Sequence, residues 1–138
     1  MTYNLTIEQK PAYLYAIVTG RNSKENVARY IVDLNRECMA RNCYRVLIEE
    51  RLEGPRLGAI DVFDTAEWGA GKARGTNKAV TIAYVDVNAE GDLMQFAENV
   101  AVNRGLHLKV FSTVADAEKW LRNEALKRTE DRGERVGI

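Results

Sequence analysis

Apolar and polar positions alternate in the first residues of the chain. Between residues 3 and 8 every second residue is apolar, which is typical of a half-buried edge strand. Lys10 and Pro11 interrupt the alternation, and residues 12–19 form a denser run of aromatic and β-branched residues before a turn at residues 20–22. The pattern predicts an opening β-hairpin.

The period then changes from two residues to that of a helix. Ser23 is a typical N-cap residue, and Asn42 is a plausible stop. One face of the predicted helix carries Val27, Tyr30, Ile31, Leu34 and Cys38. We therefore predict a helix between Ser23 and Asn42, with this face turned towards the core.

Three strand–helix units follow. Strands are predicted at residues 44–49, 79–87 and 107–111. Helices are predicted at residues 57–68, at residues 93–101 with a stop at Gly105, and from Thr113 to Ala125. A glycine-rich loop occupies residues 69–77. The order β-β-α-β-α-β-α-β-α predicts an α/β domain whose mixed, mostly parallel sheet has one antiparallel edge strand and right-handed helical crossovers.

Length and composition fit one globular domain. The chain has 138 residues, of which 46% are hydrophobic and 29% charged. We predict a single domain over residues 1–126 and a charged, flexible tail over 127–138. Lys plus Arg equals Asp plus Glu at 20 each, so the chain has no basic footprint for nucleic acid. Apolar runs are too short for a membrane span, and the start does not resemble a secretory signal, so we expect a cytoplasmic protein.

The spacing of Cys38 and Cys43 matches neither a zinc knuckle nor a CxxC redox motif. We favour two free thiols over a disulfide or a redox switch.

Gly71-Lys72 resembles part of a phosphate loop, but Ala66 and Ala73 stand where that motif needs glycine and a hydroxyl. His107 is the single histidine, which excludes a two-histidine metal site. We predict no catalytic residue, cofactor or metal.

Acidic residues are dense in the middle of the chain. They are Glu49, Glu50, Glu53, Asp61, Asp64 and Glu67. Paired carboxylates can serve acid–base chemistry or bind a hard cation. Because Arg45, Arg51 and Arg56 are interleaved with them, we favour a solvated, salt-bridged surface.

Aromatic residues provide a second candidate. A pocket between sheet and helices would be lined by Tyr13, Tyr15, Phe63, Trp68, Tyr84 and Phe96. The competing interpretation is that these residues simply fill the core.

Residues 46–60 run from a strand through Gly54-Pro55 into a predicted helix. With the opening hairpin, the four strand–helix units and the closing segment 108–121, this stretch resembles the SpoIIAA-like, STAS-type domains. That group includes bacterial anti-sigma-factor antagonists and lies near the lipid-binding Sec14 fold. The resemblance covers residues 3–122 and implies the same α/β fold.

In the antagonists, an Asp-Ser-Ser-Gly-Leu-Gly-type segment carries a regulatory serine. Here Leu57-Gly58 match its Leu-Gly, and Glu53 takes the aspartate position. Gly54 and Pro55 stand where the serines would be, and Arg56 replaces a glycine. The resemblance therefore implies a docking surface without a phosphorylation switch.

Two hypotheses of different classes follow, and an enzyme ranks below both. The first is a regulatory or interaction module that binds a protein partner through Arg21, Ser23, Arg51, Glu53, Gly54, Pro55 and Arg56. The second is a small carrier of an apolar or lipid-like ligand. Exposed edge strands often pair, so we also consider a homodimer.

Overall fold

The computed structural model describes residues 3–54, 64, 80–86, 91–103 and 107–131. Apart from Asp64, the predicted helix at 57–68 and the glycine-rich loop lie outside these residues. Gly105 and the last seven positions, 132–138, also lie outside them. The predictions made for those segments remain predictions.

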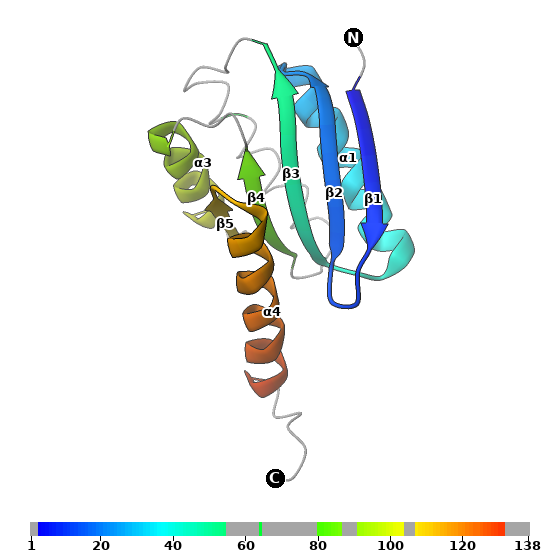
Figure 1. Ribbon diagram of the computed structural model, residues 1–138, viewed down its shortest axis with the longest axis vertical. Helices are drawn as coiled ribbons and strands as arrows, with labels where there is room; N and C mark the ends of the chain where they lie inside the picture. The colour runs from blue at the N-terminus through cyan, green and yellow to red at the C-terminus, as the bar shows by residue number, and fades with distance from the viewer. Residues whose placement is uncertain (1–2, 55–63, 65–79, 87–90, 104–106, 132–138) are drawn as a thin grey trace.

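The predicted hairpin opens the fold. Strands β1 (Tyr3–Gln9) and β2 (Leu14–Arg21) pair antiparallel, and the Lys10 N–H donates to the Tyr13 carbonyl oxygen at 2.9 Å to close the turn. Strands β3 (Arg45–Glu53), β4 (Thr81–Asp86) and β5 (His107–Phe111) then add in parallel, in the order β1-β2-β3-β4-β5. The described strands thus form the mixed, mostly parallel sheet that the sequence predicts (Figure 1).

Helix α1 (Lys24–Arg41) has the two caps predicted from the sequence. The Ser23 hydroxyl oxygen accepts from the Asn26 N–H at 3.1 Å, which satisfies one of the free donors of the first turn. Asn42 adopts the left-handed conformation at φ 51°, and its N–H donates to the carbonyl oxygens of Cys38 and Met39. Asparagine tolerates this conformation better than most residues, so the stop at Asn42 has a local cause.

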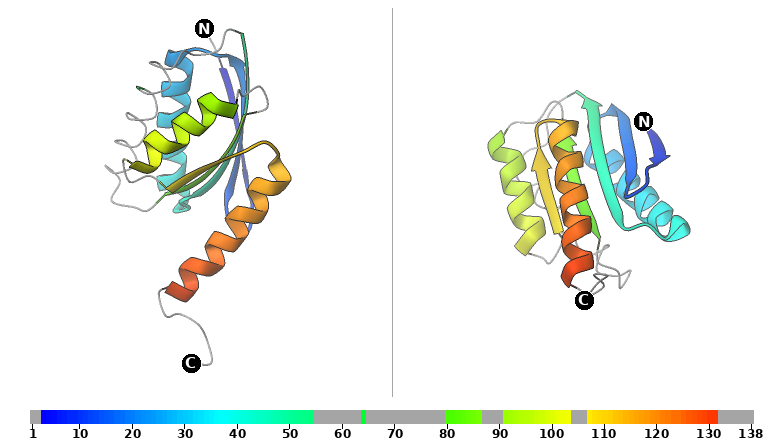
Figure 2. Two further views of the ribbon diagram at one scale, coloured as in Figure 1. Left: turned by 90° about the vertical axis from the view of Figure 1, so that its left-hand side faces the viewer. Right: turned by 60° about the horizontal axis from the view of Figure 1, so that its bottom comes forward.

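The helices cover both faces of the sheet. Helices α1 and α3 (Gly91–Asn103) lie on one face, and α4 (Val114–Asp131) lies on the other (Figure 2, left). The core beneath α1 contains the buried residues Leu14, Ala16, Val18, Val27, Tyr30, Leu34, Cys38, Val46, Ile48 and Leu52. The core beneath α4 contains Tyr13, Leu47, Ala83, Val85, Ala117 and Leu121. Successive side chains of β2, β3 and β4 therefore belong to opposite cores, because successive side chains of a pleated strand point to opposite faces of the sheet.

Two elements extend beyond their predicted ends. Strand β3 was expected to end at residue 49, but it pairs with β2 as far as Glu53. The cause is Leu52, which is fully buried on the same face as Val46 and Ile48 and so continues the period of two. Helix α4 continues to Asp131, past the position 126 at which we placed the end of the domain.

Both cysteines are free thiols: Cys38 is buried on the inner face of α1, and Cys43 is half-buried. Among the described residues, no helix is both long enough and apolar enough to cross a membrane.

Candidate functional site

Strands β2 and β3 end together at the carboxyl edge of the sheet. Arg21 is the register partner of Glu53, and the Asn22 N–H donates to the Glu53 carbonyl oxygen at 2.6 Å. The Asn26 side-chain amide, from the first turn of α1, donates to the Arg21 carbonyl oxygen at 2.9 Å. Asn22 and Asn26 are both buried, so these two hydrogen bonds hold the backbone at Arg21 and Glu53 from the interior of the protein. This edge is the usual place for ligands and partners in α/β sheets.

The edge exposes charged side chains. Arg21, Glu53 and Gly54 are all exposed. Gly54 has a φ of +106°, which favours glycine, and a Cβ atom there would lie 3.9 Å from Cγ of Arg21. The structure therefore brings together Arg21, Glu53 and Gly54 from the predicted docking set. Ser23 lies beside them, but its hydroxyl caps α1 rather than facing a partner.

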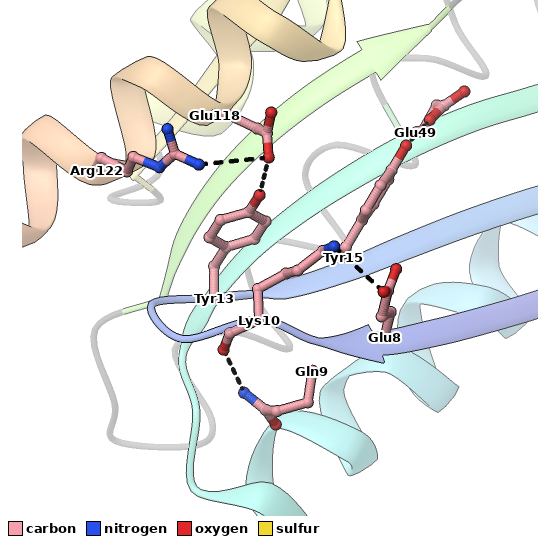
Figure 3. Close-up of polar contacts among 8 residues, drawn as sticks. All are labelled: Glu8, Gln9, Lys10, Tyr13, Tyr15, Glu49, Glu118 and Arg122. Carbon is pink, nitrogen blue, oxygen red and sulfur yellow. Dashed lines mark hydrogen bonds and ion pairs between the residues drawn. The ribbon is translucent and has the colours of Figure 1, made fainter.

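Arg51 lies two residues before Glu53 on β3, on the same face of the strand, which is the α4 face of the sheet. Its guanidinium forms an ion pair with the Glu49 carboxylate, which also accepts a hydrogen bond from the Tyr15 hydroxyl. Figure 3 shows Tyr15 reaching Glu49 along the sheet. The Arg51 side chain is 54% exposed whereas that of Glu49 is 4% exposed, so the arginine covers a buried carboxylate. Pro55 and Arg56, the last two members of the docking set, lie outside the described residues.

A group of tyrosines and carboxylates lies beneath the same edge, on the α1 face. Tyr30 is 1% exposed, and its hydroxyl donates to Oε2 of Glu50, which is 3% exposed. Glu50 is the register partner of Asp86, which is also buried, and Tyr84 lies two residues before Asp86 on the same face of β4. Burial, and next the negative charge of Glu50, raise the pKa of Tyr30 and of Tyr84 well above 10.

These contacts correct the prediction of a solvated acidic face. Glu49 and Glu50 are both buried at 3% exposure, on opposite faces of β3. The physical reason is the length of β3: residues 49 and 50 lie inside the sheet rather than in a loop after it. Asp64 does lie at the surface, where its carboxylate is 3.2 Å from the Lys24 ammonium. Asp61 and Glu67 lie outside the described residues.

The predicted aromatic pocket is wrong as a single group. Tyr13 and Tyr15 pack on the α4 face, whereas Tyr84 packs on the α1 face. Because the sheet lies between these faces, the three side chains cannot line one cavity. Phe96 on α3 is 38% exposed, and Phe63 and Trp68 lie outside the described residues.

Two tyrosine–glutamate contacts, Tyr13–Glu118 and Tyr15–Glu49, lie on the α4 face of the sheet. The Tyr13 hydroxyl donates to Oε2 of Glu118 on α4, and Arg122 lies 3.9 Å from the same oxygen (Figure 3). Burial and these hydrogen bonds raise the pKa of Tyr13 and of Tyr15 to about 12. The Tyr13–Glu118 contact joins α4 to the turn between β1 and β2, and the Tyr15–Glu49 contact joins β2 to β3.

His107 lies at the amino end of β5, away from the carboxyl edge. Its Nε2 is 3.0 Å from Oε1 of Glu124, and its ring packs edge-on against Trp120.

A groove of about 310 Å³ lies elsewhere, between β1 and α1, and is lined by Tyr3, Ala28, Arg29, Val32 and Asp33. Within the described part of the chain, no group of three or more His, Cys, Asp or Glu side chains is placed to hold a metal ion.

The architecture has a counterpart among solved structures. It is similar to an uncharacterized protein from the DUF3478 family of Shewanella loihica PV-4, which has a SpoIIAA-like fold. The TM-score is 0.51 at 23% sequence identity, and the match covers 86% of this chain and 93% of that one. The chain has a SpoIIAA-like fold.

This finding confirms the predicted resemblance at the level of the fold. No protein-family model matches the sequence, and no curated protein matches it. The SpoIIAA-like neighbour is itself uncharacterized, so the likeness carries no activity to this chain. The role of the edge has to be argued from its own residues.

Proposed function

We propose that this SpoIIAA-like domain is a non-enzymatic interaction module that binds a protein partner at the carboxyl edge of β2 and β3. The observation that carries the proposal is the rigid presentation of Arg21 and Glu53. Both side chains are exposed, while the backbone that bears them is held by the buried amides of Asn22 and Asn26. A rigid loop binds with a smaller loss of conformational entropy than a flexible one.

Charges at this edge favour a partner with complementary charges. Arg21 and Glu53 have opposite signs and are register partners, so they lie side by side. Charged groups at the rim of an interface set the specificity and the association rate more than the affinity. A protein surface with an acidic and a basic group at matching spacing fits this edge.

The carrier hypothesis receives no specific support. The aromatic residues proposed to line its pocket are divided by the sheet, and the described groove between β1 and α1 lies at the surface. The interaction module is therefore the function that we propose.

The test is affinity capture from the native host with charge-reversed variants. Arg21→Glu and Glu53→Lys change exposed side chains, so the fold should be kept. Lys119→Glu, on the exposed surface of α4, is the matched control. We expect one protein to be captured by the wild type and by Lys119→Glu, and lost with Arg21→Glu and Glu53→Lys. Capture of the same proteins by all four forms would count against the proposal that this edge binds a protein partner.

A further inference from the structure

Strand β1 has an open edge. The Lys10 N–H to Tyr13 carbonyl bond continues the β1–β2 register, and hydrogen-bonded pairs alternate along an antiparallel ladder. The backbone groups directed towards β2 are therefore those of Asn4, Thr6 and Glu8. Those directed away from β2 belong to Tyr3, Leu5, Ile7 and Gln9. Within the described residues, β1 is the last strand of the sheet, and no strand pairs with this outer edge.

This edge has few of the features that prevent strand pairing. Natural edges are blocked by charged side chains, prolines, bulges or very short strands. Strand β1 is seven residues long and contains no proline, and Glu8 is its single charged residue. Leu5 and Ile7 are half-buried on the α1 face, and the groove between β1 and α1 continues this apolar surface to Val32, which is 36% exposed.

We propose that β1 pairs with β1 of a second copy of this chain, antiparallel about a two-fold axis at Thr6. In this register Leu5 faces Ile7 of the second copy, and Tyr3 faces Gln9. Each of the four outward-directed residues then donates and accepts a backbone hydrogen bond, for about eight bonds in all. A register shifted by two residues would leave either Gln9 or Tyr3, depending on the direction of the shift, without an opposite residue in β1.

The side chains favour the same register. On the α1 face, Leu5 and Ile7 form apolar cross-strand pairs, which stabilise an antiparallel ladder. On the other face, Thr6 meets its own copy, and Asn4 meets Glu8 of the second copy. The two Glu8 carboxylates are thus kept apart. A second copy therefore fits the edge in both backbone and side chains, and the sheet continues across the dimer.

Cross-linking tests the register. At a directly opposite, non-hydrogen-bonded position the Cα atoms lie about 4.5 Å apart, which is within the range that a disulfide spans. Thr6→Cys, in a Cys43→Ser background and under mild oxidation, should give a covalent dimer on a non-reducing gel. Asn4→Cys and Glu8→Cys should not cross-link alone, but a mixture of the two should. A failure of Thr6→Cys to cross-link, or equal cross-linking at all three positions, would overturn the proposed pairing.

Charge substitutions test the dimer itself. Thr6 and Asn4 are both exposed, so lysine at either position should leave the thermal unfolding of the monomer nearly unchanged. Thr6→Lys places two like charges directly opposite each other and should convert the dimer to monomer in sedimentation velocity. Asn4→Lys faces Glu8 of the second copy and should keep the dimer. Wild-type protein that sediments as a monomer at every concentration reached, as it would if β1 pairs with another protein instead, would overturn the proposal. So would a dimer that Thr6→Lys leaves intact.

Discussion

Replacing Tyr30 by phenylalanine removes one hydroxyl and leaves the packing of the ring in place. The Tyr30 hydroxyl donates to the buried Glu50 carboxylate, and the two residues are 1% and 3% exposed. A hydrogen bond to a charged group contributes about 1.5–3 kcal/mol, so we expect Tyr30→Phe to lower the free energy of unfolding by about 2 kcal/mol. With an unfolding entropy near 0.3 kcal/mol per kelvin for a chain of this length, Tm should fall by about 7 °C.

Urea denaturation followed by circular dichroism measures this loss. Tyr15→Phe is the matched control, because its partner Glu49 keeps the Arg51 guanidinium. We expect that control to lower the free energy of unfolding by less, about 1 kcal/mol, because the Glu49 carboxylate keeps its ion pair with Arg51. A double-mutant cycle with Glu50→Gln should show coupling between Tyr30 and Glu50. A loss below about 0.5 kcal/mol for Tyr30→Phe, with no coupling to Glu50, would refute the argument that this hydroxyl satisfies a buried charge.

Three further predictions follow from single groups. The folded-state pKa is raised to about 12 for Tyr3, Tyr13 and Tyr15, whereas the ordinary value is 10.0. The unfolded chain therefore releases these protons first, so the contribution of these tyrosines to stability should be constant below pH 10 and be lost between pH 10 and 12, with tyrosinate absorbance delayed in the native protein. Ser23→Ala should lower the free energy of unfolding by about 1 kcal/mol, whereas Ser23→Asp should retain most of the stability, because either polar side chain can cap α1. Burial raises the pKa of Cys38 to about 12, so a thiol reagent should label Cys43 in the native protein and Cys38 only on unfolding. Labelling of the Cys43→Ser variant at the rate of the wild type would contradict this order.

Periodicity was sufficient to predict the main features of the fold. The alternation at residues 3–8 and the helical spacing from Val27 to Cys38 are local signals, and Ser23 and Asn42 mark the ends of α1. The end of β3 was harder to place because Glu49, Glu50 and Arg51 form a charged run. Leu52 was the available signal, since it continues the buried positions of Val46 and Ile48.

The sites beneath the edge depend on contacts between distant parts of the chain. Tyr30 and Glu50 are 20 residues apart and meet because α1 packs over β3. Tyr13 and Glu118 are 105 residues apart, and no local pattern joins them. Glu53 was a candidate because of the resemblance to STAS-type domains, and Arg21 because it lies in the neighbouring turn. The structure adds that the two are register partners. Ser23 was predicted both as the N-cap of the helix and as a member of the docking set, and its hydroxyl does cap α1.

The central claim is that the edge formed by Arg21 and Glu53 binds a protein partner. Affinity capture that compares the wild type with Arg21→Glu, Glu53→Lys and Lys119→Glu tests it most directly. We expect one partner to be lost with both edge variants and kept with Lys119→Glu. Retention of every captured protein by Arg21→Glu and Glu53→Lys, with unchanged thermal unfolding, would contradict it.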